Sequence, residues 1–199
     1  MSEFDFIHND LFDVNSSKKI KGRCYKTSTK KELKLLDRLK SLEEIFPDSI
    51  KLNESLHLIS SDNFGSIELL KLLNNKYDIK YLCLSTWSYN TDFVQLIKSI
   101  LNKGCEVVFI VDKSMRTRKA ALYAQMVLLL DEYENFKIKI HHMIHSKVTI
   151  FKTKEGYFSI EASANYSSNQ RIENFTITND EGLFNFHNKW LNEIIDKEV

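Results

Sequence analysis

The chain has 199 residues, which is long enough for one well-buried domain, and 43% of them are hydrophobic and 28% charged, as is typical of globular proteins. The formal net charge of +1 excludes a global basic field, so a polyanionic partner would have to bind a local patch. One proline and five glycines argue against long flexible linkers. We therefore expect a single domain over 1–199, with an N-terminal arm and helix in 1–50 and a sheet core in 55–199.

The N-terminal residues, the lengths of the apolar runs and the cysteines bear on the cellular compartment of the protein. The first six residues contain neither a basic segment nor an apolar segment typical of a signal peptide, and no run reaches the roughly 18 apolar residues that a membrane span needs. The three cysteines, Cys24, Cys83 and Cys105, are widely spaced and odd in number, which favours buried thiols in a reducing compartment. We expect a cytoplasmic protein with no membrane partner.

The N-terminal region begins with residues 1–27, which lack a clear period and suggest an extended arm or edge strands. Lysines and one arginine between residues 18 and 31 make this the most basic stretch, either as a solvated face or as a nucleic-acid contact. Thr29 and Glu32 then form a capping box, and leucines at helical spacing predict a packing helix that Pro47 ends.

The middle of the chain alternates short apolar runs with amphipathic segments. Such alternation predicts βαβ units with helices on both faces of the sheet. The fold class we expect is α/β, with a mixed, mainly parallel central sheet. The predicted strands are 56–60, 80–85, 105–111 and 136–140, and the predicted helices are 65–75, 91–102 and 116–134.

The C-terminal part should add antiparallel members to this sheet. A strand-like run at 145–151, a turn at 154–156 and a second run at 157–161 predict a hairpin, and 175–178 predicts a further strand. A closing helix over 183–197 would pack its apolar side chains on the sheet. These side chains are Phe184, Phe186, Trp190, Leu191 and Ile194.

The hairpin carries the residues that indicate chemistry. A strand over 145–151 places His145 and Lys147 on one face, about 7 Å apart. Its return strand would bring Ser163 and Asn165 beside them. An imidazole, an ammonium, a hydroxyl and a carboxamide at one point suit a phosphate-like anion, because the imidazole can attack or protonate while the others donate to developing oxyanion charge.

These residues resemble the signature of the phospholipase D superfamily, HxK(x)4D followed by Gly-Ser-x-Asn. The match lies at His145, Lys147, Ser163 and Asn165, with Glu173 downstream. Lys152 stands in place of the Asp of the motif, and Ala162 in place of its Gly. The resemblance implies a phospholipase D-like fold, with the catalytic hairpin in 144–179.

The resemblance also implies a mechanism. Superfamily members use two H-x-K elements across a twofold axis, and this chain has only one that is followed by Ser-x-Asn, so a symmetric homodimer is expected to be the active unit. His145 would be nucleophile in one subunit and general acid in the other, through a phosphohistidine. Lys147 and Asn165 would hold the nonbridging oxygens, Ser163 would donate or simply close the turn, and Glu173 would fix the tautomer of His145. The scheme requires no metal and no other cofactor.

Candidate substrate-binding residues follow two predicted strands. Thr86 and Trp87 come at the carboxyl end of one, where Trp87 could stack a base or pack internally. After the next strand, Lys113, Arg116 and Arg118 form either a phosphate-binding patch or a solvated helix start.

The function we expect is a nuclease-type phosphodiesterase, with DNA ranked ahead of RNA as its partner. One alternative is a nucleic-acid-binding or regulatory protein with a degenerate fold, suggested by Lys152, and another is a phosphatidyl transferase or lipase. A metal site formed by His141, His142 and His145 is a further alternative for the histidines.

Overall fold

The computed structural model describes residues 23–27, 33–36, 42–60, 64–167 and 171–196. Nine strands in this part of the chain form one sheet, in the order β2-β1-β3-β9-β8-β7-β4-β5-β6. The strands are β1 (Arg23–Thr27), β2 (Leu33–Leu36), β3 (Glu54–Ser60), β4 (Tyr81–Thr86), β5 (Glu106–Asp112), β6 (Phe136–His141), β7 (Val148–Thr153), β8 (Gly156–Ala162) and β9 (Glu173–Asn179). The helices are α1 (Leu42–Ile45), α2 (Ser66–Lys76), α3 (Thr91–Leu101), α4 (Met115–Arg118), α5 (Ala120–Glu132) and α6 (Glu181–Asp196).

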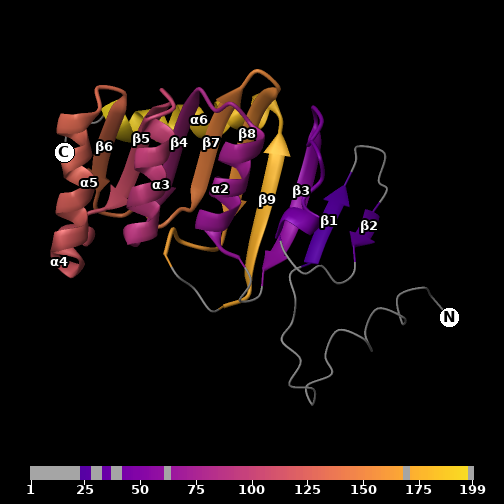
Figure 1. Cartoon of the computed structure of the whole chain (residues 1–199), viewed down its shortest axis with the longest axis horizontal. Coiled ribbons are helices and arrows are strands. Elements are labelled where there is room, and N and C mark those ends of the chain that lie inside the picture. Colours follow the sequence, from indigo (N-terminus) through magenta and orange to yellow (C-terminus); the bar gives the residue numbers. More distant parts are fainter. Residues whose placement is uncertain (1–22, 28–32, 37–41, 61–63, 168–170, 197–199) are drawn as a thin grey trace, which may run out of the picture.

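The sheet is mixed, as expected, but it is not mainly parallel. Only the neighbours β4–β5 and β5–β6 are parallel among the described strands, and the remaining pairs are antiparallel. Strand β3 runs in the same direction as β4, yet β9, β8 and β7 lie between them (Figure 1). The reason is that the β7–β8 hairpin takes the edge of β4 that a parallel β3 would otherwise occupy.

The predicted packing helix that starts at Thr29 is wrong over 33–36, where the structure has strand β2, and a helix is present only at α1. Residues 28–32, which include the capping box, and 37–41 lie outside the described part of the chain. The sequence Leu33-Lys34-Leu35 also alternates with a strand period. Residues 33–36 therefore fit either a helix or a strand by their pattern, and their pairing with β1 makes them a strand.

The helices between the central strands are confirmed, with one change. Asn90 caps α3, since its side chain accepts a hydrogen bond from Phe93 N. The long helix predicted over 116–134 is instead two helices, because Lys119 has the non-helical angles φ −141° and ψ 52°. Lys119 Nζ donates to Tyr89 O over 2.9 Å, which ties this break to the loop after β4.

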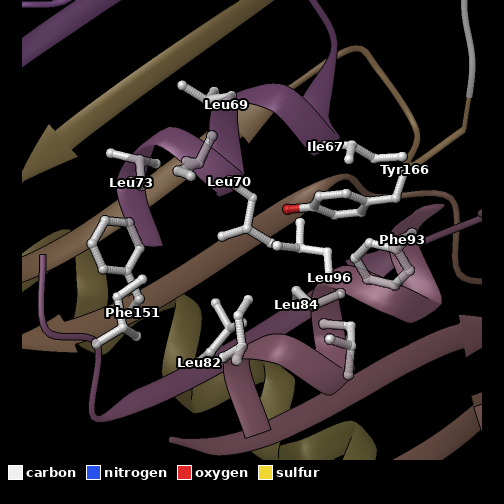
Figure 2. Close-up of a cluster of buried hydrophobic side chains, with 14 of the residues drawn as sticks. Ile67, Leu69, Leu70, Leu73, Leu82, Leu84, Phe93, Leu96, Phe151 and Tyr166 are labelled. Carbon is white, nitrogen blue, oxygen red and sulfur yellow. The ribbon is translucent and has the colours of Figure 1, made fainter. Parts of the chain in front are cut away.

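The larger core lies between the sheet and helices α2, α3 and α5, which cover one face (Figure 1). Figure 2 shows leucines of α2 facing Leu82 and Leu84 of β4, with the ring of Tyr166 beside Phe93. The rings of Phe93 and Tyr166 stack at 4.4 Å, and those of Phe151 and Phe158 at 4.7 Å. The first stack joins the segment after β8 to α3, and the second lies between the two strands of the hairpin, whose rings belong to the same core.

Helix α6 covers the opposite face, behind the sheet in Figure 1. Phe184 and Leu191 are buried there against Ile150 and other sheet residues. Helices on both faces and the α/β class are thus confirmed. The prediction for Phe186 is wrong, since 65% of its surface is exposed. In the described residues no helix has the length and apolar character that crossing a membrane requires.

The topology brings distant segments to one edge of the sheet. Strands β4, β5, β6 and β8 end at this edge, while β7 and β9 run the other way and begin there. The turn at the other end of the hairpin needs a glycine, because Gly156 has φ 153° and a Cβ there would meet the Asn179 side chain. The hairpin therefore presents the residues before β7 and after β8 side by side.

Candidate active site

His145 and Lys147 lie in the extended segment just before β7 rather than in a strand, so the strand predicted over 145–151 begins three residues late. Lys147 Nζ is 3.0 Å from His145 Nδ1 and 3.4 Å from His145 Nε2, and it donates to His145 O over 2.7 Å. The ammonium therefore contacts the ring in either tautomer. His145 is exposed and Lys147 is half-buried, so an anion reaches both from solvent.

The charge state of Lys147 is set by two opposing effects. Burial is the larger one, and it lowers the pKa of Lys147 below its ordinary 10.5, while the charge of Glu173 raises it. Glu173 is buried, with 9% of its surface exposed, at the start of β9. The Glu173 charge therefore favours the charged form of Lys147, although burial is the stronger effect on its pKa.

Ser163 connects the end of β8 to Glu173. Its hydroxyl donates to Glu173 Oε2 and accepts from Asn174 N over 3.0 Å, while its own N–H donates to Asn174 O over 3.1 Å. One residue earlier, Ala162 N donates to Lys147 O over 3.0 Å. The return strand thus lies beside Lys147, as the hairpin predicted. The hydrogen bond that Glu173 is expected to accept from the His145 ring stays a prediction.

Asn165 is oriented by the loop that follows β4. Its Oδ1 accepts from Trp87 N over 3.3 Å and lies 3.1 Å from Thr86 Oγ1, whose single hydroxyl proton it shares with Ser88 O at 3.0 Å. With Oδ1 engaged twice, Nδ2 is the end of the carboxamide that can donate to a phosphate oxygen. Thr86, which we expected to contact substrate, is fully buried at 0% exposure. This residue holds Asn165 instead.

Trp87 lies next to the catalytic candidate. The centroids of the Trp87 and His145 rings are 6.0 Å apart, and the Arg118 guanidinium is 3.8 Å from the Trp87 ring centroid. Arg118 also donates to Trp87 O over 3.3 Å and to Ser114 Oγ over 2.9 Å. These contacts place Arg118 of α4 against Trp87 beside His145, although Arg118 and Trp87 are 31 residues apart in sequence.

The other two candidate phosphate ligands are exposed at the carboxyl end of β5 and the start of α4. Lys113 N donates to His141 O over 3.0 Å, so this loop runs beside the end of β6. The Arg116 guanidinium lies 5.6 Å from the Tyr123 ring centroid, and its Nε donates to Tyr123 OH over 3.4 Å. Only Arg118 of the three touches Trp87 in a described contact.

Lys152, which replaces the aspartate of the motif, lies away from this edge. It is five residues along the chain from Lys147, roughly 16 Å at strand rise. Its Nζ is 5.2 Å from the centroid of Tyr157, whose ring packs with α6. Lys152 therefore lies on the α6 face of the sheet, whereas Lys147 lines the small cavity with Thr149 and Tyr166 on the opposite face.

The histidine cluster considered as a metal site does not form among the described residues, where no group of three or more His, Cys, Asp or Glu side chains is arranged to hold an ion. The rings of His141 and His142 stack at 5.0 Å. His145 instead contacts Lys147 and Trp87.

Two sets of side-chain hydrogen bonds that hold the hairpin in place were not predicted from the sequence. Ser85 Oγ lies 2.8 Å from Ser146 Oγ and accepts from Val148 N over 3.3 Å, which fixes the residue between His145 and Lys147. Buried Tyr166 OH lies 2.6 Å from Thr149 Oγ1. The only local signal is a polar residue inside an apolar run, as Ser85 is in β4.

Two cavities bear on what could bind. Under Lys147, a cavity of about 10 Å³ among Thr149, Tyr166 and Phe175 is no larger than one water. A cavity of about 340 Å³ lies between α2 and α3, lined by polar side chains that include Lys71 and Asp92, and it shares no residue with the first. The larger space is therefore separate from the His145 edge.

No protein-family model and no curated protein matches the sequence. Among solved structures, polyphosphate kinase from Porphyromonas gingivalis aligns with a TM-score of 0.58 and 9% identity, over 73% of this chain and 26% of that one. Nuc, a phospholipase D family member from Salmonella typhimurium, aligns with a TM-score of 0.53 and 16% identity, over 71% and 95%. Phosphatidylserine synthase from Haemophilus influenzae Rd KW20 aligns with a TM-score of 0.51 and 14% identity, over 84% and 42%.

These alignments establish the fold. The chain spans about a quarter of the length of the kinase and less than half of that of the synthase, but nearly all of Nuc. The chain has a phospholipase D-like fold, as the motif suggested. A shared fold at such identities does not carry an activity with it, so the function is argued from the site.

Proposed function

We propose that this protein is a metal-independent phosphodiesterase that cleaves nucleic acid, DNA ahead of RNA, through a phosphohistidine intermediate. The observation that carries the proposal is the meeting of His145, Lys147, Ser163, Asn165 and Glu173 at one sheet edge, although 28 positions separate the first from the last. Each of these side chains suits one part of phosphoryl transfer.

The chemistry has two steps. An imidazole nitrogen of His145 attacks phosphorus, forms a P–N bond and expels the ester oxygen, which takes a proton from a second imidazole. Water then attacks phosphorus, gives its proton to that second imidazole, and the P–N bond breaks. Lys147 Nζ and Asn165 Nδ2 donate to the nonbridging oxygens, where negative charge builds up. These cationic and amide donors supply the stabilisation that a metal would otherwise give.

The second imidazole is His145 of another copy of the chain. The sequence has a single H-x-K followed by Ser-x-Asn. A twofold axis near the exposed His145 would bring two such elements to one phosphorus, which requires a homodimer. Size-exclusion chromatography with light scattering should give twice the mass of the chain, and a monomer that still cleaves would contradict this arrangement.

Nucleic acid is the substrate that the surroundings of His145 favour. The cavity beneath Lys147 is too small for an acyl chain, and the side chains in contact beside His145 are the indole of Trp87 and, stacked on it, the guanidinium of Arg118. The alternative of a degenerate binding protein was suggested by Lys152, but this residue lies away from the site. No described contact now favours that alternative.

The test is cleavage of plasmid and single-stranded DNA by purified protein in excess EDTA, beside a His145→Ala variant. We expect cleavage by the wild type only, and a phosphorylated protein trapped by acid quenching. Binding without cleavage by both proteins would select the degenerate binding protein, and equal cleavage by both would remove His145 from the mechanism. Headgroup exchange on lipid vesicles without DNA cleavage would favour the transferase. Cleavage lost in EDTA and restored by zinc would contradict metal independence.

A further inference from the structure

The indole of Trp87 and the guanidinium of Arg118, called here the Trp87–Arg118 stack, form a feature that phosphoryl transfer itself does not use. We propose that this stack binds an unpaired nucleobase next to the phosphate that His145 attacks, so that the substrate is single-stranded or locally unpaired nucleic acid. The inference rests on the proposed function, since it concerns the same site, and it names the form of the substrate.

The Trp87–Arg118 stack is preorganised, because the protein itself holds the guanidinium in place. The Arg118 guanidinium lies 3.8 Å from the Trp87 ring centroid, which is a stacking distance. Its Nε and Nη2 groups donate to Ser114 Oγ and Trp87 O, so two donors in the guanidinium plane are already bound by the protein. The Arg118 side chain is exposed. A flat cation held in this way can accept a base on its free face.

Backbone hydrogen bonds also hold the loop that carries Trp87. Its backbone N–H donates to Asn165 Oδ1, and two residues later Tyr89 O accepts from Lys119 Nζ over 2.9 Å. The loop is therefore tied both to the proposed catalytic amide and to the α4–α5 break. A preorganised surface of this kind binds without a large ordering cost.

The position relative to His145 makes the stack relevant to catalysis. The ring centroids of Trp87 and His145 are 6.0 Å apart, and Asn165 Oδ1 accepts from the backbone N–H of the same Trp87. A phosphate held between Lys147 and Asn165 therefore has the stack beside it. The nearest chemical group of a nucleic acid that could reach the stack is the base of the adjoining nucleotide.

The positive charge of Arg118 argues against a cationic lipid headgroup as the ligand of the stack. Amine headgroups of lipids bind indole faces as cations, but Arg118 already covers the Trp87 ring with a positive charge that would repel them. Nucleobases stack on both aromatic rings and guanidinium planes. In a duplex each base is stacked between its neighbours, so an unpaired base is the group that fits.

The test measures base stacking apart from cleavage. In a His145→Ala, Trp190→Phe protein, Trp87 is the single tryptophan, since the sequence contains two. This protein is titrated with a labelled oligothymidylate and with an abasic oligomer that has the same number of phosphates. We expect quenching of Trp87 fluorescence by the oligothymidylate only, and an affinity at least about 5-fold higher than for the abasic oligomer. A duplex of equal length should bind like the abasic oligomer.

Three variants then locate the effect, with fluorescence anisotropy of the label as the readout. Trp87→Leu and Arg118→Leu should bring the ratio of the two affinities close to one, and Trp87→Tyr should restore it. The matched control is Arg116→Leu, which removes the same charge two residues away, where Arg116 lies on Tyr123. This control should weaken both affinities equally and keep their ratio.

The outcomes separate the two proposals. Equal affinities with no quenching, or no binding to either oligomer, would overturn the stacking proposal. Preference for bases that Trp87→Leu and Arg118→Leu leave intact would also overturn it. A clear preference in a protein whose wild type cleaves no oligonucleotide would keep the stack and reject the proposed function.

Discussion

Thr86 Oγ1 lies 3.1 Å from Asn165 Oδ1, and this contact joins two segments that are 79 residues apart. Thr86 is the last residue of β4 and is fully buried, whereas Asn165 is half-buried just past β8. The same oxygen of Asn165 accepts from Trp87 N. The two donors together determine which end of the Asn165 carboxamide faces a bound phosphate.

A Thr86→Val variant tests this relationship, because valine keeps the shape and lacks the hydroxyl. We expect kcat to fall about 3- to 10-fold with KM little changed, since a neutral hydrogen bond contributes about 0.5–1.5 kcal/mol. Thr86→Ser should restore most of the rate. Steady-state cleavage of a fluorogenic oligonucleotide provides the measurement, and a Thr86→Ser rate as low as that of Thr86→Val would show that the hydroxyl does not matter.

Lys152 should be dispensable for cleavage, despite standing at a position of the motif. Its ammonium lies by Tyr157 on the α6 face, so Lys152→Ala should change kcat by less than about twofold. Lys147→Ala removes a lysine from the same hairpin but at the His145 edge, and should cost about 10²–10³ in kcat. A gain of tenfold or more in Lys152→Asp would show that the replaced aspartate limits this enzyme.

The motif residues could be found in the sequence because their spacing is local. His145 and Lys147 are two residues apart, and a hairpin turn is enough to bring Ser163 near them. The position of Lys152 on the far face also follows from strand alternation alone. The alternation of strands and helices correctly indicated the α/β class for the same reason, since each unit is contiguous.

Long-range pairing could not be found in the same way. The separation of β3 from β4 depends on which strand occupies the free edge of β4, and the chain order does not state this. The contact of Arg118 with Trp87 and the buried position of Thr86 depend on how the α4 segment and the hairpin meet the end of β4. Polar residues at a strand end look alike in sequence whether they face solvent or the core.

The alkaline limit of activity should depend on Glu173. Burial lowers the pKa of Lys147 and the Glu173 charge raises it, and the lysine must be charged to stabilise phosphate, so activity is lost as pH rises through that pKa. Glu173→Gln should move the alkaline limb of kcat/KM to lower pH, whatever its effect on the maximum. Glu161→Gln, which removes a carboxylate on the α6 side of β8, should leave the limb in place. A limb unmoved in Glu173→Gln would assign it to another group.

Acid should destabilise the fold through His187 of α6, which is buried with 4% of its surface exposed. Trp190 Nε1 donates to His187 Nδ1 over 3.0 Å, and His187 Nε2 lies 3.2 Å from Glu161 Oε1. Nδ1 is therefore an acceptor, and a proton on it would face the N–H of Trp190. Burial lowers the pKa of His187 below its ordinary 6.5, although Glu161 opposes this effect.

The sign of the pH effect follows from that lowered pKa. Below pH about 6.5 the unfolded chain binds a proton at residue 187 more readily than the folded protein does, so the free energy of unfolding falls as pH falls, by about 1.4 kcal/mol for each unit of pKa shift. Urea unfolding at pH 7.5 and 5.5 should show a smaller loss in His187→Gln than in the wild type. His142→Gln is the matched control, because His142 is exposed, and it should keep the wild-type loss. An equal loss in all three proteins would mean that the carboxylates alone cause the acid sensitivity and that the pKa of His187 is the same in the folded and unfolded chain.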